Sequence, residues 1–410
     1  MKRITLLTAL CMIYAASVSI AQGPVAYFIN TTGETLSKLE LPNGPVENDI
    51  LTLGSDAMCF PNQLTVRHQT AYVVNSGTHE IQIINLETEQ TTGFIDMPSG
   101  SNPYWMEFHD TRNAYVTLLV NNSIAKVDTQ EKEILFEVPV GNGPEGLVIS
   151  RNKVFVANSA YNITSGGYDP GTVTVYDPVT ESVINTISVD LNPQMMAVDD
   201  SSFVHVVCTG DYGTNTGRIN IIDPKTEMVV ADFAIGGYPG QIAIGPDQIA
   251  YVAAPDWSFD SHVFTYHSIT HEIYHNYSNP ITVGWNVNMI ANFQDTTSFI
   301  GCFDDTIHVI DSSGAILKKF PAGDNPIGMD FNYVPCDVNG DYAVNLADIL
   351  DLIGWIYVDG PPPQWPIWRA NCNNDQVFNL EDILCQISFI YIYQEEQLVP
   401  SPRWIRYYSE

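Results

Sequence analysis

Positive charge is scarce in this chain of 410 residues, which has 16 lysines and arginines against 47 aspartates and glutamates, for a formal net charge of −31. Nucleic-acid binders need a basic surface to meet phosphates, so the acidity excludes nucleic acid as a partner and disfavours an anionic membrane surface. Hydrophobic residues make up 45% of the chain. The chain can therefore bury a core, and global disorder is excluded. The length allows two domains, or a large domain with a small one.

Long apolar runs are equally scarce, and the one that is long enough to suggest a signal peptide or a membrane span is at the N-terminus. The chain begins Met1-Lys2-Arg3, continues with an apolar stretch and reaches Ser19-Ile20-Ala21, a small-x-small cleavage pattern. This pattern predicts a bacterial-type secretory signal peptide over residues 1–21, cleaved after Ala21. We therefore expect a secreted or cell-surface protein with no membrane span after cleavage. A retained transmembrane anchor is the alternative, and the small residues before the cleavage point argue against it.

Cysteine is also too rare to build a disulfide scaffold. Six cysteines follow the predicted signal peptide: Cys59, Cys208, Cys302, Cys336, Cys372 and Cys385. An exported chain permits disulfides, and Cys336 and Cys372 are close enough in sequence to pair. The first three are far apart in sequence, so we expect them to be buried thiols.

What the sequence does have is a repeat of 40–50 residues between residues 25 and about 335. A proline recurs at the start of a short apolar strand, at Pro61, Pro103, Pro144, Pro193, Pro239 and Pro326. The last interval is a double step, with Trp285-Asn286-Val287 near its middle. Each repeat also has a strand such as Ala71–Asn75 and a turn that begins with Asn or Asp, as at Asp128. Four short strands in each repeat are typical of propeller blades.

Both ends of the repeat region contribute to one further blade. The segments Val25–Asn30, Thr35–Leu41 and Asp49–Gly54 match the second, third and fourth strands of a blade, and Pro326–Phe331 supplies its first strand. The sequence therefore predicts an all-β, seven-bladed β-propeller over residues 22–335. The ring would be closed by a blade that is shared between the two ends, which leaves no open sheet edge.

Several segments of this region resemble the YVTN-type β-propeller repeats of secreted and surface proteins. They are Tyr72–Asn75, Val138–Gly146 and Val173–Thr180. The resemblance implies the propeller fold over about 300 residues. It leaves the function open, because such propellers include binding modules, lactonases, antibiotic lyases and redox-enzyme domains.

Two Asx-rich segments of twelve residues follow the repeats, and each fits a loop that wraps calcium. Oxygen ligands at loop positions 1, 3, 5, 7, 9 and 12 suit this hard cation. In the first loop they are Asp337, Asn339, Asp341, the Ala343 carbonyl, Asn345 and Asp348, and in the second Asn371, Asn373, Asp375, the Val377 carbonyl, Asn379 and Asp382. Each loop continues into apolar residues at helical spacing. We therefore expect calcium as a cofactor and a small α-helical domain.

This tandem resembles a type I dockerin over residues 336–395, followed by a tail over residues 396–410. The resemblance implies a calcium-dependent partner, either a cohesin-like or another cell-surface protein. Tyr342 and Gln376 occupy the sixth loop position, where calcium loops prefer glycine. Asn371 replaces the usual first aspartate, so we expect weaker calcium binding in the second loop. The positions that contact partners in dockerins are here Leu346-Ala347 and Leu380-Glu381.

Aromatic residues are frequent in the loops that open on one face of the predicted ring. Those proposed for a ligand-binding face are Phe60, Tyr104, Trp105, Tyr212, Tyr238, Trp257 and Trp285, with Tyr161, Tyr168 and Phe259 in neighbouring loops. Large rigid rings suit stacking on a glycan or a peptide. The alternative is that several of these residues pack between blades.

The sequence assigns no catalytic residue. Glu107 and Glu145 lie near the starts of neighbouring inner strands and could form a carboxylate pair for acid–base chemistry. His262, His267, His271 and His275 offer a minor zinc option. No nucleophile elbow or phosphate loop occurs. We therefore expect a non-catalytic binding or scaffold protein. The alternative is an exported propeller enzyme, a lactonase or a polysaccharide-active hydrolase or lyase, tethered by its C-terminal domain.

Overall fold

The computed structural model describes residues 24–41, 44–67, 69–110, 112–162, 164–255, 260–293, 296–333, 336–339, 344–358, 370 and 379–391. Two compact units divide the chain: the propeller unit, residues 26–39 and 44–331, and the C-terminal unit, which includes residues 332–410. The predicted signal peptide and the tail from residue 396 lie outside the described residues. Within the described part of the chain, no helix is long and apolar enough to cross a membrane.

Seven sheets form the blades of a propeller, as the repeat predicts. From the innermost strand outward, the shared blade consists of β31 (Pro326–Asn332), β1 (Val25–Asn30), β2 (Thr35–Glu40) and β3 (Val46–Thr52). The next blade consists of β4 (Pro61–Arg67), β5 (Thr70–Asn75), β6 (Glu80–Asn85) and β7 (Gln90–Asp96). The two blades after it consist of β8 (Pro103–Phe108), β9 (Asn113–Leu118), β10 (Ser123–Asp128) and β11 (Glu133–Pro139), and of β12 (Pro144–Ser150), β13 (Lys153–Asn158), β16 (Thr172–Asp177) and β17 (Ser182–Ser188). The other three are β18 (Pro193–Val198), β19 (Val204–Cys208), β20 (Arg218–Asp223), β21 (Met228–Ala234); β22 (Ile242–Ile244), β23 (Ile249–Pro255), β24 (Asp260–His267), β25 (Ile273–His275) with β26 (Ile281–Trp285); and β27 (Val287–Asn292), β28 (Ser298–Cys302), β29 (Thr306–Ile310), β30 (Ile316–Pro321). A two-stranded hairpin, β14 (Tyr161–Asn162) and β15 (Gly167–Tyr168), is inserted between β13 and β16.

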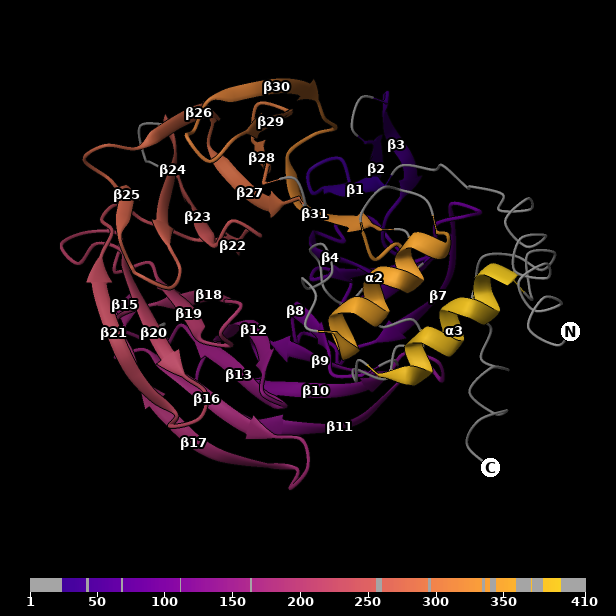
Figure 1. Ribbon diagram of the computed structural model, residues 1–410. Coiled ribbons are helices and arrows are strands. Elements are labelled where there is room, and N and C mark those ends of the chain that lie inside the picture. The colour runs from indigo at the N-terminus through magenta and orange to yellow at the C-terminus, as the bar shows by residue number, and fades with distance from the viewer. Residues whose placement is uncertain are drawn as a thin grey trace, which may run out of the picture. The chain divides into compact units, whose positions relative to one another are not determined.

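The ring closes through the shared blade that the sequence predicts. Strand β31, from the end of the repeats, pairs with β1 from their beginning, and the two lie side by side (Figure 1). The Asp330 carboxylate accepts a hydrogen bond from the Val66 N–H at 2.7 Å, which links β31 to β4 of the next blade. On the other side of the shared blade, the Phe331 ring lies 5.1 Å from that of Phe293 and 5.6 Å from that of Phe299. Closure is therefore made by side chains as well as by strand pairing.

The turn that enters a blade, which the recurring proline follows, has the same backbone geometry in most blades of this chain. The residue before the innermost strand has a positive φ in six blades, at Phe60, Asn102, Gly143, Asn192, Asn286 and Asn325. Asparagine and glycine adopt this left-handed conformation more readily than other residues, which explains why Asn-Pro recurs in the sequence. The blade that contains β22 departs from the pattern, because Gly236 and Gly237 take the positive φ and the strand begins only at Ile242.

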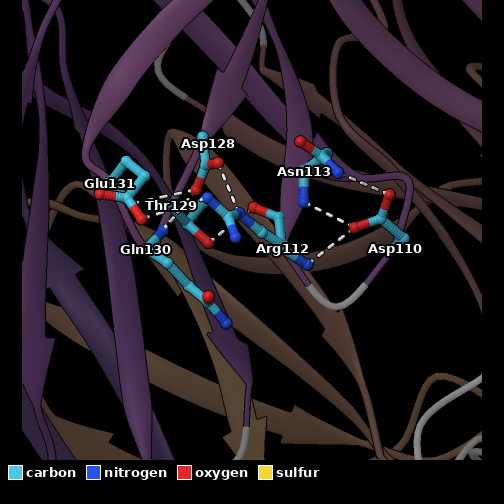
Figure 2. A network of polar contacts seen from close by, with 7 residues as sticks. All are labelled: Asp110, Arg112, Asn113, Asp128, Thr129, Gln130 and Glu131. Carbon is cyan, nitrogen blue, oxygen red and sulfur yellow. Dashed lines mark hydrogen bonds and ion pairs between the residues drawn. The ribbon is translucent and has the colours of Figure 1, made fainter. Parts of the chain in front are cut away.

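In four blades, the turn after the third strand uses an aspartate carboxylate to bind backbone amides. Figure 2 shows one of them, in which an Asp128 carboxylate oxygen accepts hydrogen bonds from the N–H groups of Gln130 and Glu131. Arg112 pairs with the other oxygen of Asp128. Nearby, the Asp110 carboxylate accepts hydrogen bonds from the N–H groups of Arg112 and Asn113, at 2.7 Å each. Part of the large negative charge therefore has a structural use in turns.

The hydrophobic core lies between neighbouring blades. One buried cluster combines Val74 and Ile81 of one blade with Met106 and Val116 of the next. The strands alternate apolar residues toward these seams, as their sequence pattern predicts. Cys59, Cys208 and Cys302 are buried thiols, which confirms the expectation for these three. The proposed partner of Cys336, Cys372, lies outside the described residues.

The described part of the C-terminal unit contains two helices, α2 (Leu346–Tyr357) and α3 (Leu380–Tyr391). They begin in the same way. The Asp348 carboxylate accepts a hydrogen bond from the Asn345 N–H at 2.8 Å, and the Asp382 carboxylate accepts one from the Asn379 N–H at 2.9 Å. This capping satisfies amides that a helix leaves free at its N-terminus. A small core joins the helices through Ile349, Leu352 and Ile383.

Candidate functional site

Four tyrosines from three neighbouring blades form a continuous row, which we call the tyrosine row. Tyr161 and Tyr168 come from the inserted β14–β15 hairpin, Tyr212 from the loop between β19 and β20, and Tyr238 from the loop before β22. Successive ring centroids are 5.3, 6.3 and 5.6 Å apart. The side chains of Tyr161 and Tyr212 remain 49% and 39% exposed, so the row offers ring surface to solvent.

A carboxylate and a fifth tyrosine adjoin this row. Glu145 is the second residue of β12. Burial raises the pKa of Tyr104, Tyr168 and Tyr212, and the negative charge of Glu145 raises it further. Burial raises the pKa of Glu145 itself to about 7, while a hydrogen bond with Ser159 acts in the opposite direction. A carboxyl of this kind exchanges a proton near neutral pH.

The amide groups beside the tyrosines complete the polar part of the site. Asn192 is fully buried, and neither its side-chain oxygen nor its nitrogen makes a hydrogen bond of ordinary geometry. Burial raises the pKa of Tyr168 and Tyr212, and hydrogen bonding of their hydroxyls with the Asn192 amide acts in the opposite direction. Gln194 donates a hydrogen bond to the Tyr212 hydroxyl at 3.1 Å. The site therefore combines tyrosine hydroxyls with two side-chain amides, which are groups that can donate and accept hydrogen bonds.

Glu145 and Glu107 do not form the carboxylate pair that the sequence suggested. The groups that influence Glu107 are Trp105, Asp330 and Arg67, which are not those around Glu145. Burial raises the pKa of Glu107 to about 7 and that of Asp330 to about 6. The two glutamates occupy the second and fifth positions of their strands, so they face different surroundings along the axis of the ring.

Trp105, Trp285 and Phe60, also proposed for the aromatic face, make their contacts away from the tyrosine row. Trp105 packs against the buried cluster between its own blade and the next, and its indole N–H donates to Glu107 at 3.3 Å. Trp285 makes an edge contact with Phe303, with centroids 5.1 Å apart. Phe60 is 53% exposed and lies over Gly77, where a Cβ atom would come within 2.7 Å of its ring. Trp257 and Phe259 lie outside the described residues.

The four histidines of the blade built on β23 and β24 do not gather at one point. His271 packs beside His205 and Phe233, whereas His262 packs beside Phe264 and Tyr277. The His275 ring shares a hydrogen bond with the Thr265 hydroxyl at 2.7 Å. The structure gives these histidines separate structural contacts.

Half of the proposed calcium ligands are described. They are Asp337, Asn339, Asn345, Asp348, Asn379 and Asp382, while Asp341, Ala343, Asn371, Asn373, Asp375 and Val377 lie outside the described residues. Asp337 and Asp348 are both fully buried, and burial raises the pKa of Asp348 to about 6, with a smaller contribution in the same direction from the charge of Asp337. Buried carboxylates favour a nearby cation, and the carboxylate and amide oxygens of the described residues are of the kind that calcium binds.

Asn192 and Gln194 are the functional candidates that the sequence analysis missed. Both were visible only as part of the Asn-Pro landmark that begins β18. The signal that separates Asn192 from the other landmark asparagines is its contact with tyrosines from two loops, which sequence spacing does not reveal.

Comparison with known proteins supports the fold alone. No protein-family model matches the chain, and no curated protein matches its sequence. Among solved structures, a hydrazine synthase chain from Kuenenia stuttgartiensis is 16% identical, with a TM-score of 0.58 over 68% of this chain and 91% of that one. A functionally unknown protein from Desulfotomaculum acetoxidans is 14% identical, with a TM-score of 0.57 over 75% and 98%. Virginiamycin B lyase from Staphylococcus aureus is 13% identical, with a TM-score of 0.54 over 68% and 90%. The chain thus has a seven-bladed β-propeller fold similar to that of these proteins.

Proposed function

We propose that the protein is a secreted binding protein whose propeller holds a glycan on the tyrosine row beside Glu145. The observation that carries this proposal is the row of four tyrosine rings, which is exposed to solvent at Tyr161 and Tyr212 and has the Gln194 amide bonded to the Tyr212 hydroxyl. Sugar rings stack on aromatic faces and carry hydroxyl groups that bind amides and carboxylates. Asn192, Gln194 and Glu145 supply such groups next to the exposed tyrosine rings.

A glycan array probed with the full-length mature protein tests this function, followed by titration calorimetry of the best ligand. We expect Tyr212→Ala to weaken binding about tenfold or more, because a central ring of the row is lost. Tyr274→Ala is the matched control, since Tyr274 has the same 39% exposure but lies on β25. Asn192→Gly should also weaken binding while keeping the turn, because Gly143 occupies the equivalent position of the preceding blade. Equal affinities of Tyr212→Ala and the parent would contradict the proposal.

An exported enzyme is the second candidate, and the pKa of Glu145 near 7 favours it. A carboxyl with this pKa suits general acid–base catalysis at neutral pH. Virginiamycin B lyase has a similar fold, although at 13% identity this likeness concerns the fold only. Turnover of a lactone or polysaccharide that disappears in Glu145→Gln would support this candidate over simple binding.

The C-terminal unit, in the same proposal, attaches the protein to a cohesin-like or other cell-surface partner when calcium is bound. Its two helices expose leucines at equivalent positions: Leu346 and Leu350 on α2, and Leu380 and Leu384 on α3. Their exposed fractions are 37, 59, 52 and 45%. Exposed apolar side chains on a small folded unit are typical of a partner surface.

Removal of calcium should lower the melting temperature of the C-terminal unit by several degrees, because a ligand that binds only the folded state stabilises it. The measurement is calorimetry of the full-length protein with calcium and with a chelator. Asp337→Asn should reduce the difference between the two conditions. Asp351→Asn on the exposed face of α2 is the control and should leave it unchanged. A chelator without effect on the parent protein would exclude the calcium assignment.

A further inference from the structure

We propose a second metal site, for zinc, at the hairpin between β28 and β29 of the propeller. Cys302, Asp304 and His308 each offer one ligand atom there, and the three atoms lie within 4.8 Å of one another. Thiolate, imidazole and carboxylate together suit zinc rather than calcium, which prefers oxygen alone. Zinc bonds of about 2.0–2.3 Å would need the side chains to approach by only about 1 Å.

In three other blades the same position is occupied by an asparagine with a hydrogen-bonded neighbour. The residue that ends the second strand and its diagonal neighbour on the third strand are Asn30 with Ser37, Asn75 with Gln82, and Asn158 with Thr174. Cys302 and His308 hold these two positions in the blade of β27–β30. In this blade, cysteine and histidine, two residue types that ligate metals, therefore occupy the positions that hold an asparagine and its hydrogen-bonded neighbour in three other blades.

Gly284 leaves room directly above the two buried ligands. A Cβ atom at this position would lie 2.6 Å from the Cys302 sulfur and 3.0 Å from Nε2 of His308. Both donor atoms therefore point to the same small volume beside a residue without a side chain. His308 is 5% exposed, and its Nδ1 atom makes no hydrogen bond. Its Nε2 atom, which faces the same volume as the Cys302 sulfur, has the Thr306 hydroxyl at 3.2 Å as a hydrogen-bond partner, and zinc would replace this contact.

Asp304 is the solvent-exposed member of the site, and a hydrogen bond holds its carboxylate in place. Its carboxylate accepts a hydrogen bond from the Thr306 hydroxyl at 2.6 Å, and this hydroxyl lies 3.2 Å from Nε2 of His308. Lys319 lies 3.7 Å from the other carboxylate oxygen, in an exposed ion pair of the kind that contributes little free energy. On binding, the Cys302 thiol loses its proton to water and its sulfur bonds to zinc. Water would take the fourth position.

The test uses the untagged mature protein with calcium present, and cobalt(II) as the spectroscopic probe. We expect one equivalent of cobalt to produce thiolate-to-cobalt charge-transfer absorption and the intense visible bands of a four-coordinate site. Zinc should then remove both. The double variant Cys302→Asn with His308→Gln should fold and lose these bands, because it recreates the Asn75–Gln82 pair of another blade.

Two further variants make the result specific. Asp304→Asn, at an exposed hairpin, should weaken zinc binding about tenfold or more. Cys208→Ser is the matched control, because Cys208 ends the second strand of its own blade but has Asn220 as its neighbour. Absence of the charge-transfer band in the parent protein would overturn the proposal. Its persistence in the double variant, or its loss in Cys208→Ser, would do the same.

Discussion

Phe331→Ala should lower the free energy of unfolding of the propeller by about 3–5 kcal/mol, the usual cost of removing a large buried ring. Phe331 is 4% exposed, and its ring contacts Phe293 and Phe299 from the preceding blade. It lies in the strand that closes the ring, so the cavity forms at the seam between the two ends of the repeat region. The melting temperature should fall by about 5–15 °C.

The control for this variant is Leu317→Ala on the outermost strand of the preceding blade. Leu317 is 51% exposed, so its truncation removes little buried surface and should leave the melting temperature nearly unchanged. Thermal unfolding followed by circular dichroism measures both. If the two variants melt together, ring closure does not depend on this aromatic seam.

Glu107→Gln should stabilise the propeller at pH 8 and have little effect at pH 5. Burial raises the pKa of Glu107 from 4.5 to about 7, so the folded state favours the protonated carboxyl. Its contribution to stability is complete below pH 4.5 and is lost as the pH rises through 7. The neutral amide removes this loss, with a gain at pH 8 on the order of 1–3 kcal/mol.

The turn aspartates have the opposite effect on the stability of the propeller, because their contribution is lost when the pH falls. The pKa of Asp128 is lowered, because hydrogen bonds from backbone amides and from Arg112 outweigh the burial that would raise it. Its contribution is present above about pH 3.8 and is lost as the pH falls further. The parent propeller should therefore be most stable between about pH 4 and 6.

Melting curves from pH 3 to pH 9, with calcium present throughout, measure this profile. Glu133→Gln is the control, because Glu133 is exposed at the start of β11 and its neutralisation removes the same formal charge. Equal gains for both variants at pH 8 would mean that the net charge of the chain, and not burial of Glu107, sets the pH dependence.

The blade number and the shared blade could be predicted because their signals are local. Asparagine or glycine before proline marks the left-handed turn that enters a blade, and an Asx residue marks the acidic turn after the third strand. Seven such units must close on themselves to leave no open edge, so Pro326–Phe331 had to pair with Val25–Asn30.

The membership of the site could not be predicted in the same way. Sequence position placed Trp105 and Tyr104 in the same loop, yet both belong to strand β8, and Trp105 packs into the core between blades while Tyr104 points to the opposite side of the strand. Likewise, Glu107 and Glu145 are both glutamates on innermost strands, but Glu107 is the fifth residue of β8 and Glu145 is the second residue of β12. Asp330 influences Glu107 only because the ring closes.

The sequence by itself determined the repeat, the order of the strands, the acidic turns and the closure of the ring, because each depends on residues that are neighbours in the chain. Only the tertiary structure decided which loops meet. It brought Tyr161, Tyr168, Tyr212 and Tyr238 together from three blades and left the Asn192 amide buried among them. Such contacts depend on the angle between blades and on the packing of their seams, which no spacing along a single chain encodes.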